Sequence, residues 1–142
     1  MNSSVHAVLS LVVAGLALAL TSPPVEPPVV VAVALVAGVG IDVDHFPLAR
    51  YGGDWSAVRR CLRDPRILFL DQSAIFERGE VGALERLLSH VVIGGVAVPL
   101  VWAVSQYLAG VVAVSLYAHV LADLISTTRD MVALDADDPR LG

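Results

Sequence analysis

The segment VVVAVALVAGVGIDVDHF, residues 29–46, joins an unbroken apolar run to a short polar stretch with two aspartates and a histidine. The first twelve of these residues carry no charge and suit a hydrocarbon environment. Ionisable groups near membrane depth are costly unless they are paired or bound to something. The segment therefore predicts a membrane helix that ends in a polar site.

The composition extends this prediction to the whole chain. Of its 142 residues, 56% are hydrophobic, and a mean hydropathy of +0.75 is too high for an ordinary soluble domain. A spanning helix needs about 20 mainly apolar residues. Four segments approach that length, at residues 4–21, 28–42, 91–107 and 108–125. We therefore expect an all-α protein, an integral membrane four-helix bundle.

Two short links and one long connection join the predicted spans. Proline lacks an amide donor and fits only the first turn of a helix, so TSPPVEPP (residues 21–28) ends one helix and starts the next. Residues 105–110 form a comparably tight link. Residues 46–89 are long and polar, and we expect a helical cap with one amphipathic helix after Asp54 and another over residues 79–89. A single membrane domain would then cover residues 1–128, followed by an acidic tail at residues 129–142.

The distribution of arginine predicts the orientation. The chain has no lysine, and all nine arginines lie in the long connection or near the C-terminus. In an alternating topology these regions share a side with the N-terminus, and the excess of arginine marks that side as cytoplasmic. We therefore predict a multi-pass protein of the cell membrane with both termini in the cytoplasm.

A cleaved signal peptide is the alternative interpretation of the N-terminal segment. The sequence ALA at residues 17–19 resembles a cleavage site, but MNSSVH has no positive n-region.

The four histidines of the chain fall at the ends of the predicted spans. His6 opens the first span, and His45 closes the second. His90 opens the third span, and His119 lies near the end of the fourth. Alternating topology places all four at one membrane face. Taken singly, His6 is an ordinary interfacial histidine, His90 a snorkelling or capping group, and His119 a hydrogen-bond partner within its own helix, but their joint placement favours a shared site.

Aspartates accompany these histidines. Asp42 lies three residues before His45, so the two side chains can lie on the same face of a helix. Asp123 follows His119 by four residues, so these two side chains should also lie on one helix face. Asp44 joins them only if the chain turns at that point. Imidazole with carboxylate is a ligand set for transition metals, so we predict one or two divalent ions, zinc first, with manganese or iron as alternatives.

Over nearly its whole length, the chain resembles the membrane-bound, metal-dependent hydrolase family, described as LexA-binding and associated with the inner membrane. The resemblance rests on four motifs in order: VHAVLS, DVDH, RLLSH and HVLAD. It implies an Arg86 partner and a set of metal-site residues. That set is His6, Asp42, Asp44, His45, His90, His119 and Asp123.

Two motifs depart from the family pattern. Ile41 replaces a proline before Asp42. Around the third motif, Glu85 and Val91 stand in place of a histidine and a serine. Glutamate also binds hard or borderline ions. Either Glu85 therefore replaces the lost histidine, or the site has lost a ligand and its activity with it.

The resemblance implies metal-assisted hydrolysis. Metal-bound water is acidic near neutral pH, and whichever of Asp42 and Asp44 is not fully engaged as a ligand can accept its proton. Arg86 can hold a phosphate oxygen, although the topology alone would also explain an arginine there. A site at the cytoplasmic face suits a phosphoester or lipid-linked substrate.

Other function classes stay open. The alternative to a hydrolase is a non-catalytic scaffold or partner-binding protein whose metal fastens helix ends together. A metal carrier ranks lower, because carriers place polar groups near mid-membrane and these spans have almost none there. Membrane lipids are the expected partners, and we expect no direct binding of nucleic acid. The sequence leaves the oligomeric state open.

Overall fold

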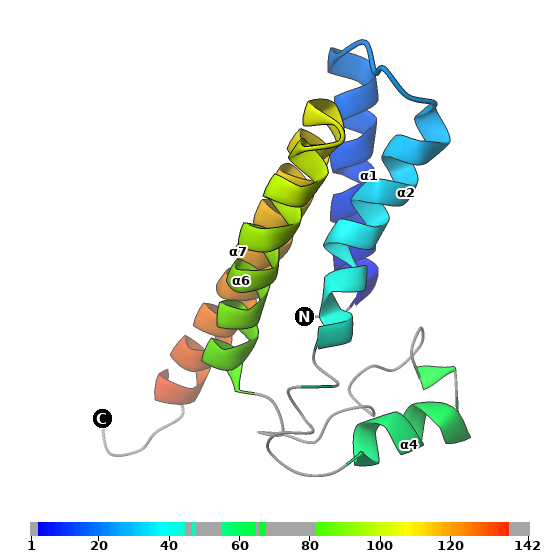
Figure 1. Cartoon of the computed structure of the whole chain (residues 1–142). Helices are drawn as coiled ribbons and strands as arrows, with labels where there is room; N and C mark the ends of the chain where they lie inside the picture. The colour runs from blue at the N-terminus through cyan, green and yellow to red at the C-terminus, as the bar shows by residue number, and fades with distance from the viewer. Residues whose placement is uncertain (1–2, 45–46, 48–54, 65, 68–81, 137–142) are drawn as a thin grey trace.

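A computed structural model describes residues 3–44, 47, 55–64, 66–67 and 82–136 (Figure 1). Within these ranges every regular element is helical, and there is no strand. The all-α prediction is therefore confirmed for the described part of the chain. The elements are α1 (Ser3–Leu20), α2 (Pro27–Gly38), the 3-10 helix η1 (Gly40–Asp44), α4 (Ser56–Arg63), α6 (Ala83–Trp102) and α7 (Gln106–Ala136).

Three segments of the described chain are long and apolar enough to cross a membrane. They are Pro27–Asp44, Leu84–Trp102 and Gln106–Arg129. The 18 residues of α1 rise about 27 Å, slightly less than the hydrocarbon core of about 30 Å. The structure thus indicates a membrane protein with three such helices, and a fourth span in α1 stays a prediction.

Side chains at the two short links explain where the helices begin and end. Pro27 and Pro28 occupy the first turn of α2, as the sequence predicts. The Thr21 hydroxyl donates to the Ala17 carbonyl at the end of α1 and also contacts the Tyr107 hydroxyl at 3.2 Å. At the other link, the Ser105 hydroxyl accepts a hydrogen bond from the Leu108 amide at 3.2 Å and caps α7. Both links are therefore held at the same end of the molecule.

Helices α6 and α7 are longer than the predicted spans. The helix expected within residues 79–89 and the third span form one helix, α6, from Ala83 onward. Helix α7 continues to Ala136, past its predicted end at residue 125 and into the predicted acidic tail. The reason is local, because neither glycine nor proline occurs between residues 111 and 138. Asp54, residues 79–81 and residues 137–142 lie outside the described ranges.

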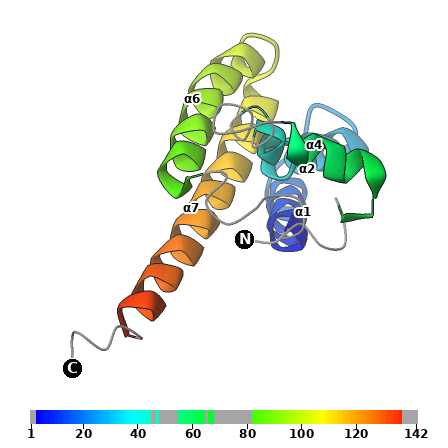
Figure 2. The same cartoon turned by 90° about the horizontal axis from the view of Figure 1, so that it is seen from below.

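Helix α7 is the centre of the fold. It packs against α1, α2 and α6, and the view from below shows it between α6 on one side and the α1–α2 pair on the other (Figure 2). Its small and branched residues fill two apolar clusters with α1 and α2. Helix α1 approaches α2 so closely at Gly38 that a Cβ added there would clash with the Ser10 side chain. This close crossing positions the polar end of the bundle.

Candidate metal centre

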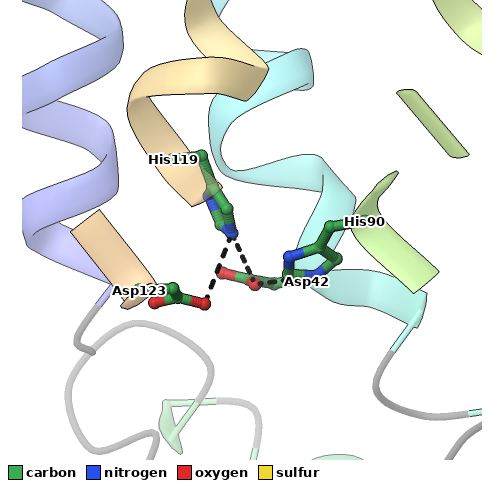
Figure 3. Close-up of side chains that lie close together, drawn as sticks. All are labelled: Asp42, His90, His119 and Asp123. Carbon is green, nitrogen blue, oxygen red and sulfur yellow. Dashed lines mark ion pairs between the residues drawn. The ribbon is translucent and has the colours of Figure 1, made fainter. Parts of the chain in front are cut away.

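Four buried or half-buried side chains meet at the end of the molecule where η1 lies (Figure 3). Asp42 comes from η1, His90 from α6, and His119 and Asp123 from α7. One ligand atom from each of the four lies within 4.8 Å of all the others. His90, His119 and Asp123 are each only 1% exposed. These four residues, called the metal cluster below, lie close enough together to hold a metal ion.

The distances within the metal cluster fit a single ion. Nε2 of His119 lies 3.4 Å from Oδ1 of Asp42 and 3.7 Å from Oδ2 of Asp123. Nε2 of His90 lies 3.8 Å from the same Asp42 oxygen. Four ligands at the usual zinc distance of about 2.1 Å in a tetrahedron would be about 3.4 Å from one another. The four ligand atoms, which lie within 4.8 Å of one another, would move closer together to reach that geometry.

His119 is oriented by the backbone. Its Nδ1 lies 2.6 Å from the Gly38 carbonyl oxygen, and because a carbonyl only accepts, Nδ1 carries the proton and donates it. In a neutral imidazole the lone pair is then on Nε2, which faces the carboxylates. Nε2 is buried and has no hydrogen-bond partner. A second ring nitrogen bonded to a carbonyl is the usual support of a metal-bound histidine.

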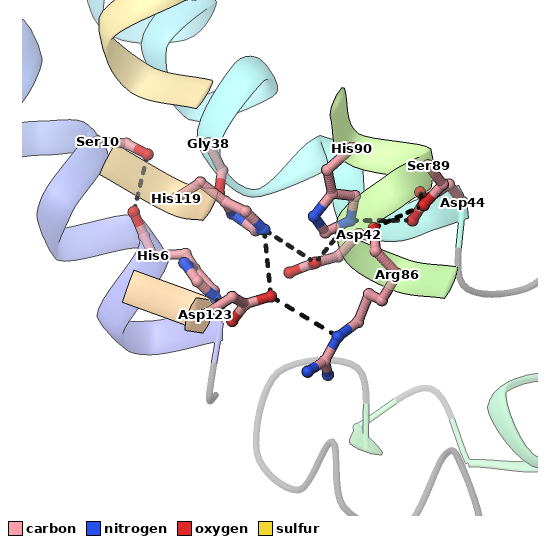
Figure 4. Close-up of polar contacts among 10 residues, drawn as sticks. All are labelled: His6, Ser10, Gly38, Asp42, Asp44, Arg86, Ser89, His90, His119 and Asp123. Atoms are coloured by element: carbon pink, nitrogen blue, oxygen red, sulfur yellow. Dashed lines mark hydrogen bonds and ion pairs between the residues drawn. The ribbon is translucent and has the colours of Figure 1, made fainter. Parts of the chain in front are cut away.

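His6 supports the cluster from α1 (Figure 4). Its ring stacks on that of His119, with centroids 3.8 Å apart, and its Nε2 lies 3.2 Å from Oδ1 of Asp123. The two carboxylate oxygens of Asp123 thus face different histidines. The Ser10 hydroxyl donates to the His6 carbonyl at 2.8 Å at the crossing with Gly38. The structure therefore brings His6 to the cluster, as an orienting neighbour or as a ligand of a second ion.

A 3-10 turn explains how both Asp42 and Asp44 reach the site. Helix α2 ends at Gly38, and residues 40–44 wind more tightly. Residues two apart lie about 160° from each other around an α-helix but only about 120° around a 3-10 helix. The sequence left open whether Asp44 lies with the other ligands, and this turn brings its carboxylate beside the metal cluster, against His90.

Asp44 contacts two neighbouring residues of α6. Its Oδ2 accepts a hydrogen bond from the Ser89 hydroxyl, and its Oδ1 lies 3.3 Å from Nε2 of His90. The sequence alone did not predict a role for Ser89, Ser10 or Gly38. Ser89 directly precedes His90 in the third motif, and that adjacency was the available signal. The helix crossing between Ser10 and Gly38 gives no such signal, because the two residues are far apart in the chain.

Arg86 places a positive charge beside the cluster. Its Nε lies 3.8 Å from Oδ2 of Asp123, and its side chain is 24% exposed. The carboxylates of Asp42, Asp44 and Asp123 thus gather at one buried or half-buried site beside this guanidinium. Like charges that lie close together in a poorly hydrated site repel one another. A divalent ion would reduce that repulsion.

One predicted ligand, Glu85, does not join this arrangement. Glu85 is exposed, and its Oε2 accepts a hydrogen bond from the Gly82 amide at 3.3 Å. It caps the N-terminus of α6 as in a capping box, where a carboxylate satisfies an amide that has no helical partner. The structure therefore places Glu85 outside the metal cluster. Glu85 was predicted to be a metal ligand, and it is instead a cap of its own helix. His45 lies outside the described residues.

Comparison of the chain with protein-family models, curated proteins and solved structures finds no match.

Proposed function

We propose that the protein is a membrane-bound, metal-dependent hydrolase acting on a phosphoester or lipid-linked substrate. A divalent ion, zinc first, would bind among Asp42, His90, His119 and Asp123. In this proposal α1 is a fourth membrane span, and residues 46–89 form a cap over the site. The arginine-rich side of the protein, with both termini, faces the cytoplasm. Within residues 46–89, the structure describes mainly α4 and residues 82–89.

One observation carries the metal site. The lone pair on Nε2 of His119 faces two carboxylate oxygens, at 3.4 Å and 3.7 Å. All three atoms are acceptors, so they repel one another unless a cation lies between them. A proton on Nε2 is the competing explanation, but charged hydrogen bonds are normally shorter, at about 2.7 to 2.9 Å. The gathering of three carboxylates, those of Asp42, Asp44 and Asp123, also favours a divalent ion.

The chain's own residues then have separable roles in hydrolysis. A divalent ion bound here would make a bound water more acidic and would polarise a phosphoryl oxygen. Asp44 is the best placed proton acceptor, because it lies at the site but outside the four-residue metal cluster. The water gives a proton to Asp44 as its oxygen bonds to phosphorus, the bond from phosphorus to the leaving alcohol breaks, and the alcohol oxygen takes up the proton that Asp44 accepted. Arg86, partly exposed beside Asp123, holds a phosphate oxygen.

A metal-stabilised scaffold is the second candidate. The cluster offers four protein ligands, the number found in closed structural zinc sites, whereas catalytic sites usually keep one position for water. It also links η1, α6 and α7, so a metal would fasten these elements together. The two candidates share the metal and differ in turnover.

Metal content tests the shared part of the proposal. The untagged protein, purified in mild detergent, should carry about one or two zinc, manganese or iron ions per chain by mass spectrometry. Asp42→Ala should lose the metal, whereas Asp64→Ala, which removes an exposed carboxylate in the connection, should keep it. An empty wild type under metal-replete conditions would refute the metal site.

Turnover separates the two candidates. Metal-loaded protein should hydrolyse at least one member of a phosphoester panel that includes phospholipids, and Asp44→Asn should lower that rate while the metal stays bound. Metal-loaded protein that hydrolyses none of them would favour the scaffold.

A further inference from the structure

An apolar groove of about 470 Å³ lies between α2 and α6, with α7 as its floor. All eleven residues that line it are glycine, alanine, valine, leucine or isoleucine. Its volume is within the usual range of about 300 to 1,000 Å³ for ligand pockets. The groove exists because small side chains, Ala37, Gly40 and Ala97, stand where larger ones would fill the space between the helices.

The groove leads to the metal cluster along each of its three walls. On the α2 side its last residue, Ile41, directly precedes Asp42. On α6 it begins at Ile93, three residues after His90, and on α7 it ends at Leu116, three residues before His119. A molecule lying in the groove would therefore present one end to the cluster.

The length of the groove along the helix axis is close to the thickness of the hydrocarbon in one membrane leaflet. Its α2 wall runs from Ala32 to Ile41, which corresponds to about 14 Å along the helix axis. Half of the hydrocarbon core is about 15 Å. All three walls belong to segments long and apolar enough to span a membrane. The surroundings of the groove are then hydrocarbon, and its far end lies near the bilayer midplane.

The lining of the groove favours a hydrocarbon chain as its occupant. None of the eleven lining side chains carries a polar atom that could bind a polar ligand.

We infer that this groove holds an acyl chain of a phospholipid and presents its phosphate to the metal cluster and Arg86. The inference rests on the proposed function and specifies its substrate class as a phospholipid drawn laterally from one leaflet. The partly exposed guanidinium of Arg86 supplies the charge complementary to the phosphate. Water-soluble phosphoesters would gain nothing from the groove.

Lipid retention tests the groove without relying on turnover. The probes are dioleoyl phosphatidic acid and dioleoylglycerol, which has the same chains and no phosphate, each added to detergent-purified protein and counted by native mass spectrometry. Wild type should retain about one phosphatidic acid per chain and less dioleoylglycerol. Ala97→Trp fills the groove and should weaken retention about tenfold, the effect of displacing roughly two methylenes.

The matched control is Val96→Trp, which adds the same side chain at a 56% exposed position outside the groove. It should retain phosphatidic acid like wild type. Val36→Trp provides a second groove variant, since Val36 lines the groove but is 71% exposed and its replacement leaves the helix packing intact. At least one folded groove variant must lose the lipid for the inference to stand.

Metal content, measured on the same samples, separates the two proposals. Loss of lipid in the groove variants alone supports the groove, even if the wild type contains no metal and the hydrolase proposal fails. Equal retention in wild type, groove variants and control overturns the groove, even if all of them contain metal. Equal retention of both probes by wild type would also overturn the inference, because the phosphate would then play no part.

Discussion

The two longest helices, α6 and α7, are both strongly apolar, yet they are used differently. In the spanning segment of α7, 39% of the residues are buried within the protein, compared with 6% in that of α6. Helix α7 contacts three other helices and supplies two residues of the metal cluster, whereas α6 packs mainly on α7 and supplies one. Apolar composition thus marks a helix for the membrane without showing whether protein or lipid will cover it.

The largest expected effect contrasts the two faces of α7. His119→Leu removes a ligand of the cluster, whereas Tyr117→Leu alters a side chain that is 69% exposed two residues earlier. We expect His119→Leu to lower metal affinity by more than about 100-fold, since even outer-shell residues contribute 10- to 100-fold. Isothermal titration with zinc measures this. Equal affinities in the two variants would remove His119 from the site.

A second contrast compares two glycines, one at a helix crossing and one on α6. Gly38→Ala should destabilise the protein by about 1 to 3 kcal/mol, because its Cβ would overlap the Ser10 side chain. Gly95→Ala meets nothing within 4 Å and should stabilise the helix by up to about 1 kcal/mol. Thermal unfolding in detergent gives both values. If Gly38→Ala is as stable as wild type, the close α1–α2 crossing is not a feature of the protein.

His6→Phe tests the support that α1 gives to α7. Phenylalanine preserves the ring stack on His119 but removes the nitrogen 3.2 Å from Asp123. As an orienting neighbour, His6 should contribute about 10- to 100-fold to metal affinity. As a ligand of a second ion, its replacement should lower the number of ions from two to one. Titration distinguishes these results, and unchanged number and affinity would show that His6 has neither role.

The smallest effect is expected at the start of α6. Glu85→Gln keeps an oxygen that can accept from the Gly82 amide, so stability should change by no more than about 0.5 kcal/mol. Metal content should be the same as in wild type, because the structure places Glu85 outside the cluster. A loss of metal in this variant would restore the original prediction that Glu85 is a ligand.

Much of the fold could be predicted because its causes are local. Apolar runs gave the approximate membrane helices, and the prolines of residues 21–28 gave the end of α1 and the start of α2. The convergence of His90, His119, Asp42 and Asp123 was also predictable, because alternating helices bring their polar ends to one side. Glu85 was assigned from its place in a motif, which could not show that it binds its own helix end.

By itself, the sequence determined that the chain is helical and apolar enough for a membrane and that His6, Asp42, His90, His119 and Asp123 lie toward the same side of its successive apolar segments. These properties depend on side-chain chemistry and on spacing along one helix. Only the tertiary structure decided that α7 is central, that Gly38 meets Ser10 while its carbonyl orients His119, and that α2 and α6 leave a groove. Those features depend on the distances between helices, which are set by side chains far apart in the chain and packed against one another.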